Sequence, residues 1–441
     1  MNLFGVKLSK NLNMLTAGHV DKRKTTRSLI KTLHLTSELY GGAGISALRL
    51  HSQLLKASYS SFIIYGAGDS PLANSKKFTP SGASICRYGD RFLDQKVWSL
   101  RKSNSSLFTR TKRFIKNGLQ NAVREYDVIH LHWIAKWLDW PSLFDAIPRD
   151  VPIVLTLHDS SFFAGGCHQT NGCVKFESGC SHCPMLKNDV FDLAAQGFRI
   201  RKKCFEGRKI YPVPNSVWMA AHASKAALFK PFPLEQPIFP GIDTEAFEPL
   251  DRPTCRRILG IPEDKFVVCA GSADLSDSNK GMRLLLEALA LLPVRIRENL
   301  LLLTYGAGAL PNEVAGVPVH QVGFVANERL LSTVYSAANI YVTPSQMETF
   351  GMTAAEAGAC GLPVICFATG GLPEIVRHGE TGWVVDLKAG SRGLADALEV
   401  SFESPEKCRE MGREGRERVV ENFEIRKSTE QYVKLYDKIL A

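Results

Sequence analysis

The sequence predicts an α/β protein with two doubly wound domains, and three observations support this prediction. Short apolar runs alternate with amphipathic segments from Leu29 onward, the alternation occurs twice, and a cluster of prolines separates the two copies. Alternating strands and helices are typical of parallel sheets covered by helices, which bind ligands at the carboxyl ends of their strands. With 441 residues, of which 45% are hydrophobic and 22% charged, the chain is long enough for two domains and unlike a disordered sequence.

Short apolar runs predict the buried strands of both halves. In the first half these runs are Ile30–Leu35, Ser61–Tyr65, Val128–His132, Ile153–Thr156 and Ile210–Val213. In the second half they are Phe266–Gly271, Leu301–Tyr305, Val319–Val322, Ile340–Thr343, Pro363–Cys366 and Gly382–Val385. Amphipathic segments between them predict helices at Ile45–Lys56, Lys112–Ala122, Met282–Leu292, Glu328–Ala337, Thr353–Gly358 and Leu372–Arg377.

Prolines mark the boundary between the predicted domains. The four prolines Pro231, Pro233, Pro237 and Pro240 exclude a helix or a central strand in this segment. After Ser404 a charged tail carries a helical apolar stripe that has to be buried, made of Tyr432, Leu435, Tyr436 and Ile439. We therefore expect a basic extension at 1–28, domains at 29–236 and 237–422, and a helix at 423–441 that packs across the domains.

Positive charge is concentrated in the first half. Residues 1–240 contain 33 Lys and Arg against 16 Asp and Glu, whereas residues 241–441 contain 21 against 28. The segment Arg101–Arg124 holds seven of these cations and no acid, which fits either an anionic surface, such as a membrane or nucleic acid, or a solvated helix. The chain shows no uninterrupted apolar run of about 18 residues, no signal peptide, and few cysteines. We expect a cytoplasmic protein, with peripheral contact to the inner membrane face as a further expectation.

The densest group of chemically useful residues follows the strand that ends near Thr343. Glu348 and Glu356 bracket a loop-to-helix junction. Free backbone N–H groups at the start of such a helix, around Gly351, can bind phosphate. The two carboxylates can then accept hydrogen bonds from neutral hydroxyl groups, and a solvent-facing Glu348 with a helix-dipole Glu356 is the plainer alternative.

Two features of the first half also lie after predicted strands. A glycine turn containing Gly41, Gly42 and Gly44 permits close approach of the backbone to a phosphate or an acceptor. Its spacing is not that of a dinucleotide-binding loop, and a glycine turn alone is a weak signal. His158 ends a buried strand, where a core histidine is the plainer interpretation.

The stretch Val342–Gly382, which contains Glu348-Thr-Phe-Gly-Met-Thr-Ala-Ala-Glu356 and Thr369-Gly-Gly-Leu-Pro-Glu374, resembles the C-terminal signature of retaining GT-B glycosyltransferases of family 4. Within that family it is most similar to colanic acid WcaC-like exopolysaccharide transferases. The resemblance extends over most of the chain and implies a GT-B fold, in which two Rossmann-like domains face a cleft. It also implies sugar transfer from a nucleotide sugar, with a UDP- or GDP-sugar as donor and a saccharide or polyprenyl-linked acceptor in surface polysaccharide synthesis; nucleic acid is not an expected partner.

The resemblance implies a role for individual residues. By position, Glu348 and His158 face the donor sugar from opposite sides of the cleft, Glu356 binds the ribose diol, and Lys280 neutralises the diphosphate. The backbone that contacts the donor corresponds to Phe350, Gly351, Met352 and Thr353. The glycine turn Gly41, Gly42 and Gly44 corresponds to the acceptor-side loop.

One position departs from the family pattern. Most relatives hold an arginine a few residues before the lysine, whereas the segment from Gly271 to Lys280 contains none. We expect Ser272 and Ser276 to hydrogen-bond the phosphates while Lys280 supplies the charge. The resemblance implies transfer with retention and without a metal, so no catalytic cofactor is expected, in agreement with the lack of a D-x-D element in a suitable loop.

The loop at 165–184 contains four closely spaced cysteines, Cys167, Cys173, Cys180 and Cys183. Four thiols can close a tetrahedral zinc site in a loop that lacks a core of its own. The spacing is not that of a standard zinc finger, so a structural zinc and free or oxidised thiols stay equal alternatives, with His168 and His182 as further candidate ligands. Similar transferases carry a cysteine-rich loop at this place, so the resemblance implies that it shapes the rim of the cleft.

Two other functions stay open at this point. The same architecture occurs in nucleotide-sugar epimerases and phosphorylases, although a pyridoxal-phosphate lysine context is not evident. A basic, zinc-stapled nucleic-acid-binding protein would use Arg101–Arg124 and the cysteine loop. Neither an aromatic RNA-binding platform nor a helix-turn-helix accompanies this charge, which disfavours that function.

Overall fold

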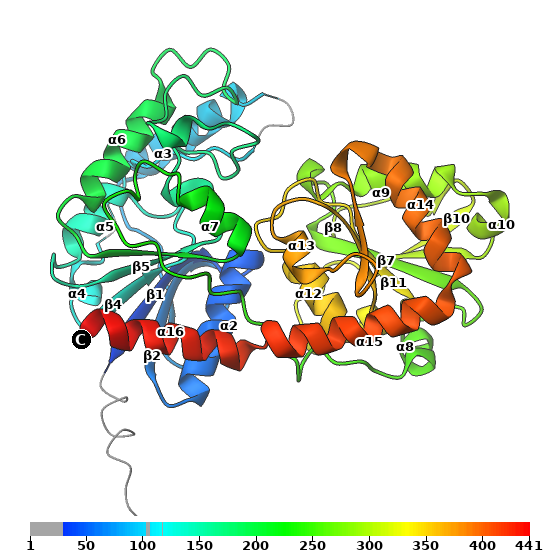
Figure 1. Ribbon diagram of the computed structural model, residues 1–441. Helices are drawn as coiled ribbons and strands as arrows, with labels where there is room; N and C mark the ends of the chain where they lie inside the picture. Colours follow the sequence, from blue (N-terminus) through cyan, green and yellow to red (C-terminus); the bar gives the residue numbers. More distant parts are fainter. Residues whose placement is uncertain (1–29, 103–105, 117) are drawn as a thin grey trace, which may run out of the picture.

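The computed structural model describes residues 30–102, 106–116 and 118–441, so the predicted extension at 1–28 lies outside the described residues. The chain forms two largely parallel sheets with helices packed around each, side by side and joined along one edge (Figure 1). This arrangement confirms the prediction of two doubly wound α/β domains.

The first sheet has six parallel strands in the order β3-β2-β1-β4-β5-β6. Their bounds are β1 Lys31–Glu38, β2 Ser60–Ala67, β3 Ser75–Lys77, β4 Val128–Leu131, β5 Ile153–Leu157 and β6 Ile210–Pro214. The central strands β4 and β5 are buried at every residue, as expected for strands covered on both faces. The helices of this domain are α2 Gly42–Lys56, α3 Ser84–Leu100, α4 Gln120–Val123, α5 Trp140–Ala146, α6 Leu193–Phe205 and α7 Val217–Ala223.

The second sheet has the order β13-β12-β11-β7-β8-β10-β9, and only its edge strand β9 runs antiparallel to its neighbour among the described strands. Its strands are β7 Phe266–Asp274, β8 Leu300–Ala307, β9 Glu313–Val314, β10 Val317–Gln321, β11 Ile340–Thr343, β12 Val364–Phe367 and β13 Gly382–Val385. Its helices are α8 Arg252–Leu259, α9 Met282–Leu291, α10 Val294–Arg297, α11 Glu328–Ser336, α12 Met352–Ala359, α13 Leu372–Ile375, α14 Gly390–Glu403 and α15 Pro405–Asn422.

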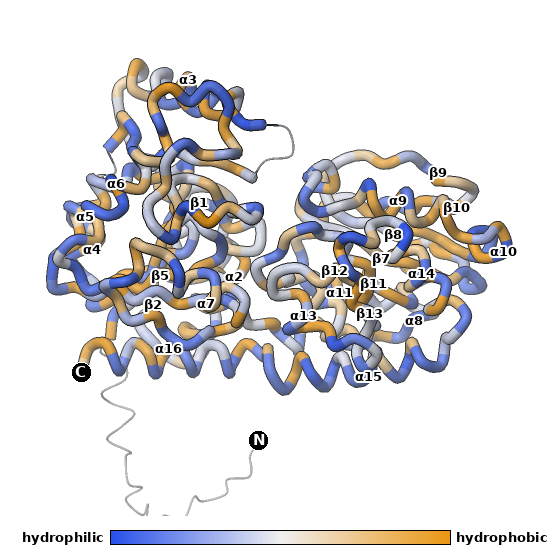
Figure 2. Tube along the Cα trace, turned by 45° about the horizontal axis from the view of Figure 1, so that its top comes forward, coloured by the Kyte–Doolittle hydropathy of each residue, from blue (hydrophilic) through white to orange (hydrophobic). Residues whose placement is uncertain are grey.

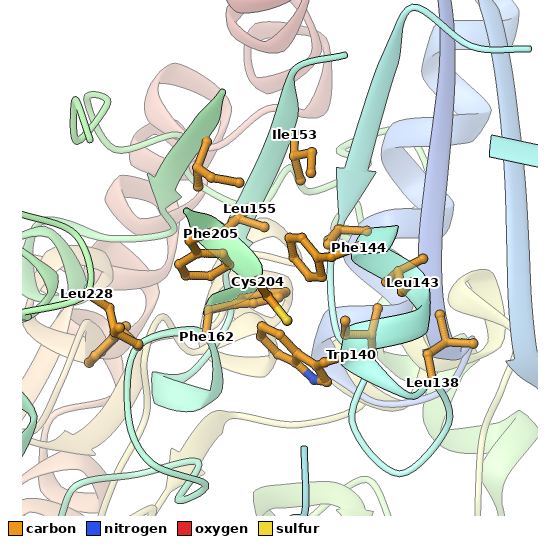
Figure 3. Close-up of a cluster of buried hydrophobic side chains, with 14 of the residues drawn as sticks. Leu138, Trp140, Leu143, Phe144, Ile153, Leu155, Phe162, Cys204, Phe205 and Leu228 are labelled. Atoms are coloured by element: carbon orange, nitrogen blue, oxygen red, sulfur yellow. The ribbon is translucent and has the colours of Figure 1, made fainter. Parts of the chain in front are cut away.

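An aromatic cluster fills the first domain between β5 and the helices α5 and α6 (Figure 3). Trp140 stacks on Phe144 with ring centroids 5.6 Å apart, and Phe205 lies 5.6 Å from Phe144. The buried Arg201 guanidinium lies over the Trp140 ring and donates hydrogen bonds to Ser161 and Thr111. Large aromatic rings with fixed partners make this part of the core stiff.

The C-terminal segment crosses from the second domain to the first. Helix α15 packs on the second domain and is mostly hydrophilic along its length (Figure 2), and α16 (Ile425–Leu440) continues onto the first domain beside α2 (Figure 1). The hydroxyl group of Tyr436 bonds His130 at 2.7 Å, and that of Tyr432 bonds Thr156 at 2.8 Å. The apolar stripe of the tail is therefore buried against the first sheet.

The predicted helix at Lys112–Ala122 is wrong. The described residues from 112 to 119 form no helix, and α4 begins only at Gln120. The backbone N–H groups of Phe114 and Ile115 donate to the Asp90 carboxylate, and that of Arg113 donates to Asp139 at 2.7 Å. These amides bond distant carboxylates instead of the carbonyls of a helix, so long-range contacts override the local pattern.

Asp90, Asp94 and Asp139 neutralise part of the basic segment Arg101–Arg124. The described ion pairs are Arg110 with Asp90 and Asp94, Arg113 with the same two acids, and Lys116 with Asp139. Several of the cations that the sequence offered to an anionic surface therefore have partners inside the protein. Among the described residues, no helix combines the length and apolar character that crossing a bilayer requires.

Candidate functional site

Two helix N-termini face each other where the domains meet. Helix α12 begins after Gly351, which has a φ of 111°, and α2 begins after Gly41, which has a φ of 82°. Neither N-terminus is capped by a side chain. A Cβ atom at Gly42 would lie only 3.8 Å from Met352 Cγ, so the two helix starts are in close proximity. Unpaired amides and the positive ends of two helix dipoles thus converge on one place, which favours an anion.

Lys280 and Glu348 form an ion pair beside α12. Lys280 Nζ lies 2.6 Å from Glu348 Oε1, and both side chains retain partial exposure. Burial alone would lower the pKa of Lys280, but the Glu348 carboxylate outweighs burial and raises the pKa. Lys280 is therefore a fixed cation at neutral pH, held where the predicted diphosphate would need one.

Backbone contacts hold these two loops together. Gln346 donates its backbone N–H to Asn279 O at 2.8 Å, and its side-chain amide donates to Ser278 O at 2.9 Å. Gly281 is in the left-handed region, and a Cβ there would meet Pro344 O at 1.9 Å. Only glycine permits this approach, so the position of Lys280 relative to Glu348 depends on it.

His158 lies at the end of β5 and meets the second domain through its backbone. The Thr349 hydroxyl donates to His158 O at 2.8 Å and accepts from the Asn215 side chain at 3.2 Å. Glu374 crosses the same boundary, where its carboxylate accepts the N–H groups that open α7. The sequence-predicted residues His158, Glu348 and Lys280 are thus brought to one boundary between the domains.

Behind His158 lies a row of buried histidines that sequence analysis only partly foresaw. His132 Nδ1 contacts His158 Nε2 at 3.1 Å, and His132 Nε2 contacts His34 Nδ1 at 3.1 Å. His130 stacks on His132 with ring centroids 4.1 Å apart. Burial lowers the pKa of all four, that of His158 to about 4, so each is neutral at pH 7. The row fixes the ring orientation of His158.

To bind a metal ion, these histidines would have to lose hydrogen-bond contacts that their ring nitrogens already make. His34, His130 and His132 are the described group of three whose ligand atoms all lie within 4.8 Å of one another. Both nitrogens of His130 contact hydroxyl groups, of Tyr436 and Thr156, at 2.7 Å. Both nitrogens of His132 contact other histidines. The residues therefore fit a hydrogen-bonded row better than a metal site.

Glu356 is buried and bridged to the first domain. Its side chain is 5% exposed, and Oε1 lies 2.7 Å from Nη2 of Arg49, which comes from α2. The Nε atom of Arg49 lies 2.7 Å from Glu328 Oε1, and the Tyr335 hydroxyl donates to Glu356 Oε2 at 3.3 Å. Burial alone would lower the pKa of Arg49, but the two carboxylates outweigh it and raise the pKa. Sequence analysis missed Arg49, because nothing in α2 signals a partner 307 residues away.

The remaining predicted donor contacts are engaged within the protein. The Ser272 hydroxyl donates to Asp274 O at 2.8 Å, and the hydroxyl and N–H of Ser276 both bond the Asp274 carboxylate. Phe350 is buried against Phe239 and Phe423, so only its backbone can face a ligand. The roles predicted for Ser272, Ser276 and Thr353 stay predictions.

The four cysteines are free thiols of one irregular loop. Cys167 is buried, and Cys180 Sγ accepts the Gly165 N–H at 3.1 Å. Burial raises the pKa of Cys180 to about 11 and also raises that of Cys183. His168 is not a spare ligand, because it bonds Asp159 at 2.6 Å and Thr109 at 3.0 Å.

Zinc in this loop stays a prediction, and metal analysis tests it. The four sulfurs would have to move closer to share one ion, since the described groups of atoms within 4.8 Å do not include them. If zinc binds, purified protein contains about one equivalent, and Cys180→Ser with Cys183→Ser removes it and lowers stability. Less than a stoichiometric amount of zinc, with all four thiols titratable in the folded protein, would contradict the prediction.

Comparisons with known proteins agree with this geometry. Residues 251–418 match the family described as Glycosyl transferases group 1. D-inositol 3-phosphate glycosyltransferase 1 of Catenulispora acidiphila is 27% identical over 305 residues, which are 65% of this chain and 66% of that protein. Alpha-maltose-1-phosphate synthase of Mycolicibacterium smegmatis is 37% identical over 113 residues, 24% of this chain and 29% of that protein. The chain thus spans less than two thirds of the length of these curated relatives.

Solved structures share the fold of the whole chain. Sucrose-phosphate synthase from Thermosynechococcus elongatus has a TM-score of 0.66 at 22% identity, covering 93% of this chain and 99% of that one. Anabaena HepE in complex with UDP-glucose has a TM-score of 0.64 at 18% identity, covering 93% and 100%. Together the comparisons show that the second domain is similar to group 1 glycosyltransferases and that the chain has a GT-B fold. The curated relatives named here are not WcaC-like transferases, so that finer resemblance is not supported by them.

Proposed function

We propose that the protein is a glycosyltransferase that moves a sugar from a nucleotide sugar to a saccharide or polyprenyl-linked acceptor, with retention of configuration. The observation that carries this proposal is the convergence of two uncapped helix N-termini, at Gly42 and Met352, beside the Lys280–Glu348 pair and His158. A diphosphate placed there would be bound by backbone amides, helix dipoles and one ammonium group.

The chemistry follows from where charge develops. As the bond between sugar and diphosphate breaks, the leaving diphosphate gains negative charge, and Lys280 with the helix N-termini stabilises that charge. Glu348, held 2.6 Å from Lys280, orients the ammonium group and can accept a hydrogen bond from a sugar hydroxyl. Neutral His158 can hydrogen-bond the sugar from the opposite domain without adding charge. The departing diphosphate takes up the proton of the acceptor hydroxyl on the same face.

A UDP-sugar is the favoured donor, because the similar fold of HepE is solved in complex with UDP and with UDP-glucose. A role in surface polysaccharide synthesis is supported by the sequence resemblance and by the fold of WaaG, whose structure is described as that of a lipopolysaccharide glycosyltransferase. The names of the curated relatives add inositol 3-phosphate to the acceptors worth testing.

Replacing Lys280 tests the donor site. Wild-type protein should be stabilised against heat by one class among UDP-, GDP-, ADP- and dTDP-sugars. Lys280→Ala should lose that shift and reduce transfer by about 10²–10³-fold, because the leaving group loses its cation. The matched control Lys388→Ala removes an exposed lysine of the same domain and should leave both readouts unchanged.

Four results would contradict the proposal. The donor site would be misplaced if Lys280→Ala kept near-normal transfer with an intact fold. Interconversion of the donor without transfer to any acceptor would favour an epimerase, and phosphate-dependent cleavage of a saccharide would favour a phosphorylase. RNA binding without any donor turnover would favour the nucleic-acid-binding alternative.

A further inference from the structure

A cavity in the first domain is lined by residues of α5 and α6. These two helices lie on the side of that domain away from the second domain (Figure 1). The cavity has a volume of about 630 Å³ and runs between α5, α6 and the residues before α4. We call it the basic groove, because its charged lining consists of Lys112, Lys116, Arg149, Arg199, Lys203 and Arg208 with only Asp145 and Glu206. Six cations against two acids is a strong local excess of positive charge.

Ion pairs with described residues neutralise little of the positive charge of the basic groove. Lys116 pairs with Asp139, whereas the other five cations form no ion pair with a described residue. Arg208 donates to the backbone carbonyls of Ile147 and Phe144, and Arg149 donates to that of Glu206. Backbone carbonyls orient these guanidinium groups without cancelling their charge. Burial and the neighbouring Arg149 lower the pKa of Arg208, and the nearby Asp145 carboxylate only partly opposes this shift.

The floor of the groove is rigid. Phe144 and Cys204 line it and belong to the aromatic cluster of the first domain (Figure 3). The Arg208 guanidinium lies 5.8 Å from the Phe144 ring centroid, and Arg199 and Lys203 lie one turn apart on α6. The packed floor and the helix therefore hold the backbone of these cations in place before a ligand binds, which reduces the entropic cost of binding.

We propose that the basic groove binds phosphate groups, carried either by anionic lipid headgroups or by a soluble phosphorylated compound. Forked guanidinium groups and flexible ammonium groups are the side chains that recognise phosphate. The site is separate from the junction of α2 and α12, so it does not depend on the proposed transfer reaction. The groove also contains part of the basic segment Arg101–Arg124, because Lys112 and Lys116 of that segment line it.

A pair of matched double variants tests the proposal. Arg199→Gln with Lys203→Gln removes two groove cations, and Lys202→Gln with Lys209→Gln removes two exposed cations of the same domain that do not line the groove. Binding of inorganic pyrophosphate is measured by calorimetry, and binding to vesicles is measured by sedimentation. The vesicles are phosphatidylcholine alone or mixed equally with phosphatidylglycerol. The donor site is unchanged in all proteins, so a loss confined to the Arg199→Gln, Lys203→Gln variant reports on the groove.

Each cation should contribute about 1 kcal/mol to the binding free energy, so Arg199→Gln with Lys203→Gln should weaken binding about 30-fold. The control variant, Lys202→Gln with Lys209→Gln, should weaken it about threefold or less. Weaker pyrophosphate binding by the groove variant identifies a soluble anion as the ligand. Weaker binding that is confined to phosphatidylglycerol vesicles identifies lipid headgroups. Either result supports the proposal. Absence of binding to both probes by the wild-type protein would overturn it. Equal losses in the two double variants would also overturn it, because they would show a response to net charge alone.

Discussion

Arg49→Met should lower the free energy of unfolding by about 3–5 kcal/mol, because it removes the only charged partner described for the buried Glu356 carboxylate. Methionine keeps much of the side-chain volume, so the loss reports charge rather than a cavity. The substitution also releases Glu328 and the contact between Arg49 and the Phe247 ring. Urea unfolding followed by circular dichroism measures the effect, with the midpoint compared between variants.

A second substitution separates charge from packing. Arg49→Met with Glu356→Gln leaves no unpaired buried charge, so it should recover much of the lost stability. Glu328→Gln alone should cost less, because that carboxylate is 35% exposed. A single Arg49→Met variant within 1 kcal/mol of the wild type would show that water reaches Glu356 and that the bridge is not a stabilising contact.

Mild acid should destabilise the fold by about 5 kcal/mol between pH 6 and pH 5, because four buried histidines resist protonation. Burial lowers the pKa of His34, His130, His132 and His158 below the usual 6.5. Below pH 6.5 the unfolded chain binds protons that the folded chain excludes, so stability is highest above this pH and falls as pH decreases. Such a loss is comparable with the whole stability of many domains.

The slope of stability against pH is the decisive readout. His34→Gln removes one titrating group and should reduce the slope by about 1.4 kcal/mol per pH unit, whatever its effect at pH 8. A flat stability profile from pH 7 to pH 5 would show that the histidine row is already protonated or accessible to water.

The sequence predicted the buried strands well, because each is an apolar run bounded by turn residues. It missed the short edge strands β3 and β9, which are not apolar runs. It also predicted the junction at Glu348 and the glycine turn, which are local patterns whose geometry follows from strand ends and helix starts. The predicted helix at Lys112–Ala122 does not form, because its amides bond Asp90 on α3 and Asp139 just before α5, and no local pattern encodes such distant partners.

The contacts between domains were beyond sequence reasoning for the same reason. Arg49 meets Glu356 and Glu328 only once both domains have folded. The histidine row needs the register that places His34 opposite His130 on neighbouring strands, and no pairing of strands can be read from two apolar runs. His130 on β4 and His132 just after its end, spaced by two, were the one signal that could have suggested a cluster.

The return of α16 to the first sheet has a consequence for biosynthesis. During translation the ribosome delivers the first domain long before Tyr432 and Tyr436, whose hydroxyl groups bond Thr156 and His130. The nascent first domain therefore keeps part of its apolar surface exposed until α16 has left the exit tunnel. Chains that lack α16 should depend on chaperones for this half of the protein.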